Sequence, residues 1–200
     1  MNKYNPHIHH RRSIRLKGYD YSQAGLYFIT ICTQNRQYMF GNITNGIMKL
    51  NNAGVMVQKW YHELENKFAD IKNHEMIIMP NHFHCIIENT GSNAGADLRV
   101  CPNNPMTNKN ILVENGIIGE HTTMGEYIGS PLHRVVQWFK TMTTNEYIRN
   151  VKSDNWQRFD GKLWQRNYWE RIIRNENEYL QISKYIIENP MKWENDKLRY

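Results

Sequence analysis

The chain has 200 residues, 40% of them hydrophobic, which is enough apolar mass for one domain with a sizeable core. Its formal net charge is +6, and five of the 25 basic side chains lie in residues 1–17, where there is no acidic one. This clustering predicts a basic N-terminal arm over residues 1–17 that contacts phosphates. No apolar run approaches the ~20 residues that span a bilayer, and no hydrophobic stretch of a secretory signal follows the first charges. Cys32, Cys85 and Cys101 are far apart, which argues against a disulfide scaffold and favours a cytoplasmic protein.

The first half of the chain predicts a strand, a helix and a hairpin. Residues 26–34 are rich in β-branched and aromatic types and predict a buried strand. Residues 51–69 carry apolar side chains at helical spacing and predict an amphipathic helix. Residues 76–87 consist of two short apolar runs around Pro80-Asn81, a pair typical of a tight turn, and therefore predict a hairpin.

The second half begins with an expected loop insertion, because residues 89–129 are rich in Asn, Gly and Thr without a sustained period. Ser130-Pro131 marks the start of a helix, and residues 163–173 predict another strand. Asn175 begins a last helix with a capping-box-like pattern, and Pro190 ends it. This order of elements favours an α+β fold: an antiparallel sheet with helices packed on one face, in a ferredoxin-like sandwich.

His82-Phe83-His84 is the first constellation that carries chemistry. Alternate residues of a strand point to the same face, so His82 and His84 would stand side by side while Phe83 and Cys85 face the core. Two neighbouring imidazoles can chelate one divalent metal ion. A His-x-His pair is weak evidence by itself, so the pattern leaves a metal site and a structural role open.

The second constellation lies on the last predicted helix. Tyr185 is the only aromatic residue on the polar side of this helix, and Asn189 lies one turn further on, close enough to share a site. The phenol is a candidate nucleophile and the amide oxygen a candidate metal ligand, although a tyrosine at the edge of a packed face is the alternative. With the histidine pair these groups suit phosphoryl transfer, provided that the helix crosses the sheet with its phenol toward the imidazoles.

The sequence resembles a known family at these motifs. MPNHFHCII is similar to the HUH motif (His, a bulky hydrophobic residue, His) of single-tyrosine transposases, and LWQRNYWERIIRN followed by YIIENPMKW resembles the REP-associated tyrosine transposase branch. The resemblance covers roughly residues 13–193 and implies one HUH endonuclease-type domain over residues 1–200. It also implies cleavage and rejoining of single-stranded DNA near hairpins through a covalent 5′-phosphotyrosine, with Mg²⁺ or Mn²⁺.

Carried over residue by residue, the resemblance makes His82 and His84 metal ligands, Tyr185 the nucleophile and Asn189 a third ligand. Arg171 stands where the family often has a histidine. Imidazole ligands suit Mn, Zn or Fe better than Mg, so Mg²⁺ follows from the resemblance alone.

Other residues are assigned more coarsely. Tyr168 competes for the role of nucleophile, but its strand-like context and the lack of a polar neighbour four residues on favour packing or base stacking. The candidate DNA-binding residues combine positive charge with one aromatic ring, and their alternatives are solvated charges, a core tryptophan and a solubilising N-terminal tail. They are Arg11, Arg12, Arg15, Lys17, Lys140, Trp164 and Arg166.

Three functions therefore compete. The first is a transposase with one catalytic tyrosine and one divalent metal, acting on hairpin-bearing single-stranded DNA. The second is a domesticated descendant that binds hairpin nucleic acid without cutting it. The third is a metal-dependent hydrolase in which the histidine pair activates water and Tyr185 is structural. A monomer and a homodimer are both compatible with the sequence.

Overall fold

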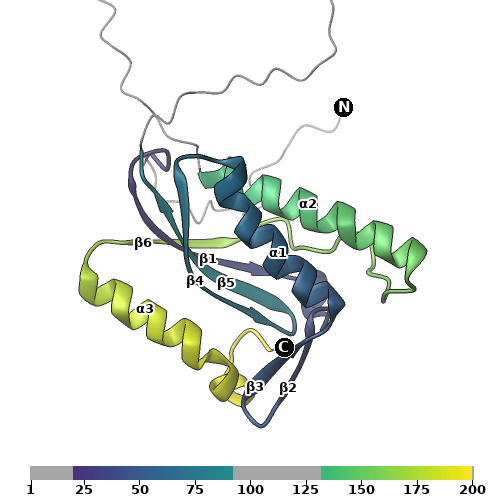
Figure 1. Ribbon diagram of the computed structural model, residues 1–200. Coiled ribbons are helices and arrows are strands. Elements are labelled where there is room, and N and C mark those ends of the chain that lie inside the picture. Colours follow the sequence, from purple (N-terminus) through teal and green to yellow (C-terminus); the bar gives the residue numbers. More distant parts are fainter. Residues whose placement is uncertain (1–19, 92–131, 200) are drawn as a thin grey trace, which may run out of the picture.

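The computed structural model describes residues 20–91 and 132–199, which form an α+β fold around a four-stranded antiparallel sheet (Figure 1). This fold class is the one that the sequence predicts. The strands, in the order in which they lie in the sheet, are β4 (Ile71–Met79), β5 (His82–Asn89), β1 (Gly25–Cys32) and β6 (Trp169–Ile173).

β5 is a central strand, and its position follows from the predicted hairpin. It pairs with β4 across the Pro80-Asn81 turn and with β1 on its other side. The register sets His84 opposite Thr30 and His82 opposite Cys32 on β1. Because alternate residues share a face, the two histidines lie on one face of the sheet and Phe83 lies on the other.

Two helices cover the face that carries Phe83. They are α1 (Asn52–Lys67) and α2 (Leu132–Ser153), and they pack side by side over the sheet (Figure 1). Asn51 caps α1, because its side chain accepts a hydrogen bond from the Gly54 N–H at 2.9 Å. The main core forms between these helices and the sheet.

The third helix, α3 (Glu176–Glu188), lies over the opposite face, which carries the histidines (Figure 1). Asn175 caps it as predicted, and a 3₁₀ helix, Asn189–Asn195, with Pro190 near its start, follows. The predicted arrangement had helices on one face only, and α3 differs because β5 is buried on both faces. Ile86 points away from α1 and needs its own cover, which α3 provides.

Several local features depart from the sequence expectations. A small hairpin, β2 (Gly41–Thr44) and β3 (Ile47–Leu50), was not predicted. Of the strand expected at 163–173 only β6 is regular, and Trp164 forms an isolated bridge with Thr33. The predicted arm at 1–17 and most of the predicted insertion lie outside the described residues, while Asn89, where the insertion was expected to begin, ends β5.

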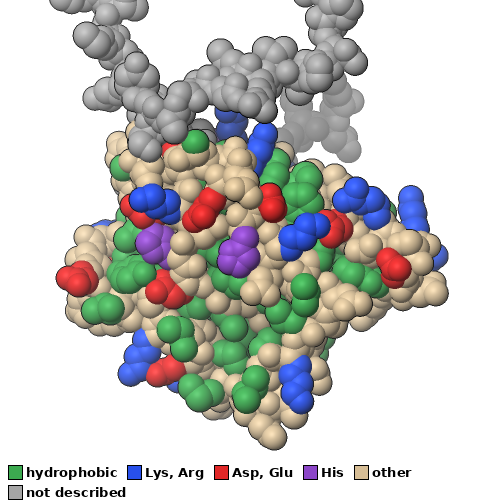
Figure 2. All heavy atoms as spheres, viewed as in Figure 1, with side chains coloured by type: hydrophobic (Ala, Val, Ile, Leu, Met, Phe, Trp, Pro, Cys, Tyr) green, Lys and Arg blue, Asp and Glu red, His purple; other side chains and the backbone are tan. Residues whose placement is uncertain are grey.

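The surface of the described part carries charges of both signs. On the face shown in Figure 2, basic and acidic side chains are interspersed rather than gathered in a block of one sign. Cys32 and Cys85 are buried free thiols. In residues 20–91 and 132–199 there is no helix with the length and apolar character needed to cross a membrane.

Candidate active site

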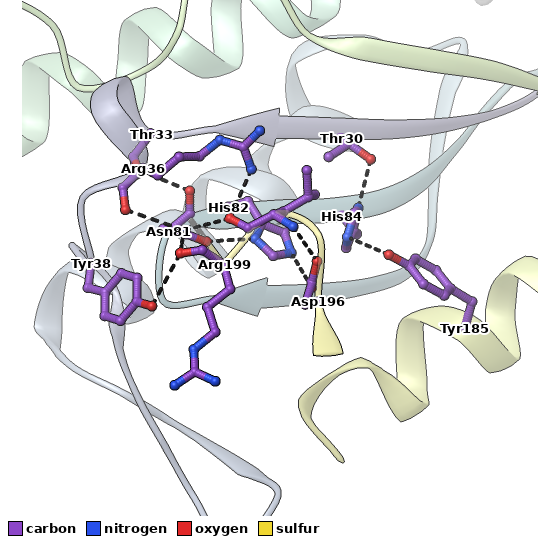
Figure 3. A network of polar contacts seen from close by, with 11 residues as sticks. Thr30, Thr33, Arg36, Tyr38, Asn81, His82, His84, Tyr185, Asp196 and Arg199 are labelled. Carbon is purple, nitrogen blue, oxygen red and sulfur yellow. Dashed lines mark hydrogen bonds and ion pairs between the residues drawn. The ribbon is translucent and has the colours of Figure 1, made fainter. Parts of the chain in front are cut away.

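Two buried imidazoles form the centre of the candidate site (Figure 3). His82 and His84 are 0% and 2% exposed, and their ring centroids are 4.6 Å apart. Burial lowers the pKa of His82 to about 2, with help from His84 and Arg36, and lowers the pKa of His84 to about 3. Both rings are therefore neutral at pH 7, which is the form that binds metal ions.

Neighbouring side chains fix the orientation of both rings. Thr30 Oγ1 lies 2.7 Å from His84 Nδ1, across the β1–β5 pair. Asn81 Nδ2 donates a hydrogen bond to the carbonyl oxygen of Leu198 at 2.8 Å, so its Oδ1 must be the atom that lies 2.8 Å from His82 Nδ1. Since an amide oxygen only accepts, His82 carries its proton on Nδ1, and its Nε2 presents a lone pair.

Tyr185 brings a phenol from α3 to this centre. Its Oη lies 3.4 Å from His84 Nε2, which confirms the expectation that the last helix directs its phenol at the imidazole pair. The Tyr185 ring meets Phe28 edge-on at 6.1 Å, and Phe28 stacks on the His84 ring at 5.3 Å. Burial raises the pKa of Tyr185 and the charge of Asp196 raises it further, while hydrogen bonding by Asn189 opposes them, so the phenol is protonated at pH 7.

Three buried acceptor atoms in this region have no hydrogen-bond partner among the described residues. They are His82 Nε2, Asn189 Oδ1 and Asp196 Oδ2. Buried polar atoms are normally paired, so a cluster of orphaned acceptors points to a missing donor or cation. Asp196 and Asn189 also line a cavity of about 790 Å³ together with Tyr185 and His84.

These residues fit a divalent ion only if an amide oxygen takes part. Among the described residues, no group of three or more His, Cys, Asp and Glu side chains is arranged to hold a metal ion. Asn189, which is 2% exposed, offers its amide oxygen as a third ligand atom, and it lines the same cavity as His84. The neutral imidazoles and the unpaired amide oxygen together suit such an ion.

The rim of the cavity holds an aromatic side chain that the sequence did not single out. Trp169 lines it from the edge strand β6 and is 43% exposed. The guanidinium carbon of Arg36 lies 5.8 Å from the centre of the Trp169 ring, which is within cation–π range. The sequence offers a signal for this residue, because Trp169 follows Tyr168 in an aromatic stretch, but it does not show which ring is exposed.

The burial of Trp164 contradicts the prediction that this ring stacks on unpaired bases. Trp164 is 3% exposed and packs between Phe40 and Phe139 in the main core. Its Nε1 donates a hydrogen bond to Thr143 Oγ1 at 2.9 Å. The alternative of a core tryptophan is therefore the correct one.

The other predicted residues lie away from the histidines. Lys140, Arg166 and Tyr168 line a second cavity of about 730 Å³ beside α2. Lys140 Nζ donates to the carbonyl oxygens of Gln165 and Arg166 at 2.6 and 3.1 Å, and burial lowers the pKa of Lys140 to about 8. Arg171 pairs with Glu178 on α3 at 3.0 Å. Arg11, Arg12, Arg15 and Lys17 lie outside the described residues.

Comparison with solved structures identifies the class of fold. A structure of the REP-associated tyrosine transposase bound to a REP hairpin matches with a TM-score of 0.51 at 16% sequence identity, over 89% of this chain and 73% of that one. A candidate transposase from Deinococcus radiodurans is less similar, with a TM-score of 0.42 at 13% identity over 88% of this chain and 96% of that one, which is too low to assign a fold. The fold is therefore transposase-like.

The family is shown by a relative in sequence. An uncharacterized protein of Haemophilus influenzae (strain ATCC 51907 / DSM 11121 / KW20 / Rd) is 40% identical over 196 residues, 98% of this chain and 97% of its own length. The chain belongs to the same family as that protein. A comparison with protein-family models finds no match.

Proposed function

We propose that the protein is a metal-dependent single-stranded DNA transposase of the tyrosine HUH type, which cleaves and rejoins DNA near hairpins. The observation that carries this proposal is the 3.4 Å contact between Tyr185 Oη and His84 Nε2 inside a cavity. A phenol that only packed on the sheet would have no reason to face a pair of buried imidazoles. The cavity also gives this phenol access to a substrate from outside.

The proposed reaction is a transesterification at phosphorus. Tyr185 Oη attacks the phosphodiester, a bond forms between Oη and phosphorus, and the bond to the 3′ oxygen breaks. The phenolic proton is lost on attack, and the leaving oxygen takes up a proton to become a free 3′-OH. Because the phosphotyrosine retains the ester, a 3′-OH can reverse the step and rejoin strands.

The chain's own residues prepare this step. His82, His84 and Asn189 would hold one Mg²⁺ or Mn²⁺ ion, which when bound supplies positive charge to polarise the phosphodiester and stabilise the charge that develops there. Thr30 and Asn81 hold the two imidazoles in place. Burial keeps both rings neutral, so no proton has to leave them before they bind a metal.

The rim of the cavity supports single-stranded DNA as the substrate. The exposed Trp169 ring offers a stacking surface for an unpaired base, and Arg36 beside it adds positive charge. Lys197 lines the same cavity and adds further positive charge near the phenol, whereas Lys192 in this cavity is ion-paired with Glu188 at 2.8 Å. A hairpin partner is proposed by analogy with the structural neighbour, which is bound to a REP hairpin.

A covalent-adduct assay tests the proposal. The full chain is incubated with hairpin-bearing single-stranded DNA and Mn²⁺, and a protein–DNA adduct is sought after denaturation. We expect an adduct that disappears in Tyr185→Phe and persists in the matched variant Tyr168→Phe, whose ring lines the other cavity. Cleavage without an adduct would support the hydrolase instead, and tight binding without cleavage would support the binding module.

A further inference from the structure

Two buried acceptor atoms face each other beside the histidine pair. His82 Nε2 and Asp196 Oδ2 are 3.6 Å apart, and their side chains are 0% and 7% exposed. Neither atom has a hydrogen-bond partner in the part of the chain that the structure describes. Figure 3 shows the carboxylate directed at the His82 ring from the segment 196–199.

This contact is longer than a hydrogen bond, because 3.6 Å separates His82 Nε2 from Asp196 Oδ2. The three carbonyl oxygens of Leu198, Arg36 and Arg199 surround Asn81 Nδ2, which fixes the Asn81 amide and with it the proton on His82 Nδ1. The lone pair of His82 Nε2 therefore points at a carboxylate oxygen. Two buried acceptors at this distance repel each other unless a cation lies between them.

The chain holds the carboxylate in this position with several hydrogen bonds. Asp196 Oδ1 accepts from the Leu198 N–H at 2.7 Å, which leaves Oδ2 as the oxygen that faces His82. Arg36 Nη1 and Asn81 Nδ2 both donate to the Leu198 carbonyl oxygen, at 2.9 and 2.8 Å. The segment is thus fixed to the same turn that orients His82.

We propose that Asp196 is a ligand of the divalent ion, so that the segment 196–199 completes the metal site from outside the sheet and α3. The inference rests on the proposed function, because His82 and His84 hold the same ion. Two ligand atoms about 2.1 Å from one ion lie about 3.0 Å apart at a right angle and about 3.4 Å apart at the tetrahedral angle. His82, His84 and Asp196 as they stand in the described residues are not arranged to hold a metal ion. The observed 3.6 Å therefore has to close to one of these distances, by a few tenths of an ångström, when the ion binds.

A carboxylate ligand also changes the metal that the site prefers. Two imidazoles alone suit Zn or Fe as well as Mn, whereas carboxylate and amide oxygens suit Mg and Mn. A set of two imidazoles, the Asn189 amide and the Asp196 carboxylate is mixed in character and suits Mn²⁺ well. The negative charge of Asp196 also offsets one of the two positive charges of the ion in a buried site.

Mn²⁺ binding by the full chain tests the inference without measuring activity. Free Mn²⁺ is followed by electron paramagnetic resonance for the unsubstituted protein, for Asp196→Asn and for the control Asp160→Asn, an exposed carboxylate on a different segment of the chain. We expect Asp196→Asn to bind Mn²⁺ at least about tenfold more weakly. Asp160→Asn should bind as the unsubstituted protein does.

Thermal unfolding in EDTA provides the second measurement. The carboxamide that Asp196→Asn introduces can donate a hydrogen bond to His82 Nε2, so the variant should unfold at the same or a higher temperature without metal. Added Mn²⁺ should raise the unfolding temperature less than it does in the unsubstituted protein. A residue with a structural role alone would lower the unfolding temperature in EDTA and would leave the increase caused by Mn²⁺ unchanged.

The outcomes separate this inference from the proposed function. Unchanged Mn²⁺ affinity in Asp196→Asn, with binding lost in His84→Ala, overturns the role of Asp196 and leaves the proposed function in place. No Mn²⁺ binding by the unsubstituted protein overturns both. Weaker binding in Asp196→Asn with normal metal-free stability supports the inference even if no DNA adduct is found.

Discussion

Replacing Thr30 by valine removes one hydrogen bond from the centre of the site and changes little else in shape. Thr30 is 6% exposed, and its Oγ1 lies 2.7 Å from His84 Nδ1. In the tautomer that leaves His84 Nε2 free to bind a metal, the ring proton is on Nδ1 and Thr30 Oγ1 accepts it. Valine has no acceptor, so this proton would be left buried and unpaired, at a cost of about 1–3 kcal/mol in the free energy of unfolding. The loss of this orienting contact should also weaken Mn²⁺ binding about 10–100-fold.

Urea unfolding in EDTA and Mn²⁺ titration measure the two effects separately. Thr30→Ser keeps the hydroxyl and serves as the matched control, so it should retain most of the metal affinity that Thr30→Val loses. Thr30→Val with the Mn²⁺ affinity of the unsubstituted protein would refute the view that His84 binds metal through Nε2 with Nδ1 held by Thr30. Equal losses in the valine and serine variants would assign the effect to packing on β1 instead.

Two further predictions follow from burial. Trp169→Ala should weaken binding of single-stranded DNA by about 1–3 kcal/mol with little change in stability, as measured by fluorescence titration. Trp164→Ala should instead lower the free energy of unfolding by about 3–5 kcal/mol, as measured by urea unfolding. The reverse pattern would contradict the assignment of Trp169 to DNA stacking and of Trp164 to the core. Burial holds the pKa of His82 near 2 and that of His84 near 3, below the ordinary 6.5, so below pH 6.5 the unfolded chain binds protons that the folded chain excludes. The free energy of unfolding in EDTA should therefore fall as the pH drops from about 6.5 toward 3, by at most about 1.4 kcal/mol per pH unit for each histidine. His84→Gln should reduce this slope by about half, and an unchanged slope would count against the buried neutral state.

Local signals in the sequence predicted the frame of the site. The alternation around His82 and His84 placed both rings on one face because a strand has a period of two. The Asn175 cap set the start of α3, which in turn set the position of Tyr185. The Asn45-Gly46 pair between β2 and β3 is an equally strong local signal for a hairpin, with positive φ at both residues, although that hairpin was not predicted.

The sequence could not show which side of a helix is buried when both an apolar side and a polar side could pack against the sheet. Leu180 and Ile187 are apolar residues of α3, yet their side chains are 57% and 67% exposed. Ser183 and Asn189 are buried in their place, because α3 turns Tyr185 and Asn189 toward the histidines. Helical periodicity shows which residues of a helix are apolar, but it does not show which face of the helix packs against a polar site.

The contacts that orient the proposed metal ligands have the weakest local signal in the sequence. Asn81 is separated from Leu198 by 117 residues, and its position after Pro80 suggested only a turn. In the structure the Asn81 carboxamide fixes the proton of His82 through its oxygen and holds Leu198 through its nitrogen. The same amide therefore determines both sides of the 3.6 Å gap between His82 Nε2 and Asp196 Oδ2. A change at Asn81 should consequently disturb both atoms at once, whereas Thr30 acts on His84 alone.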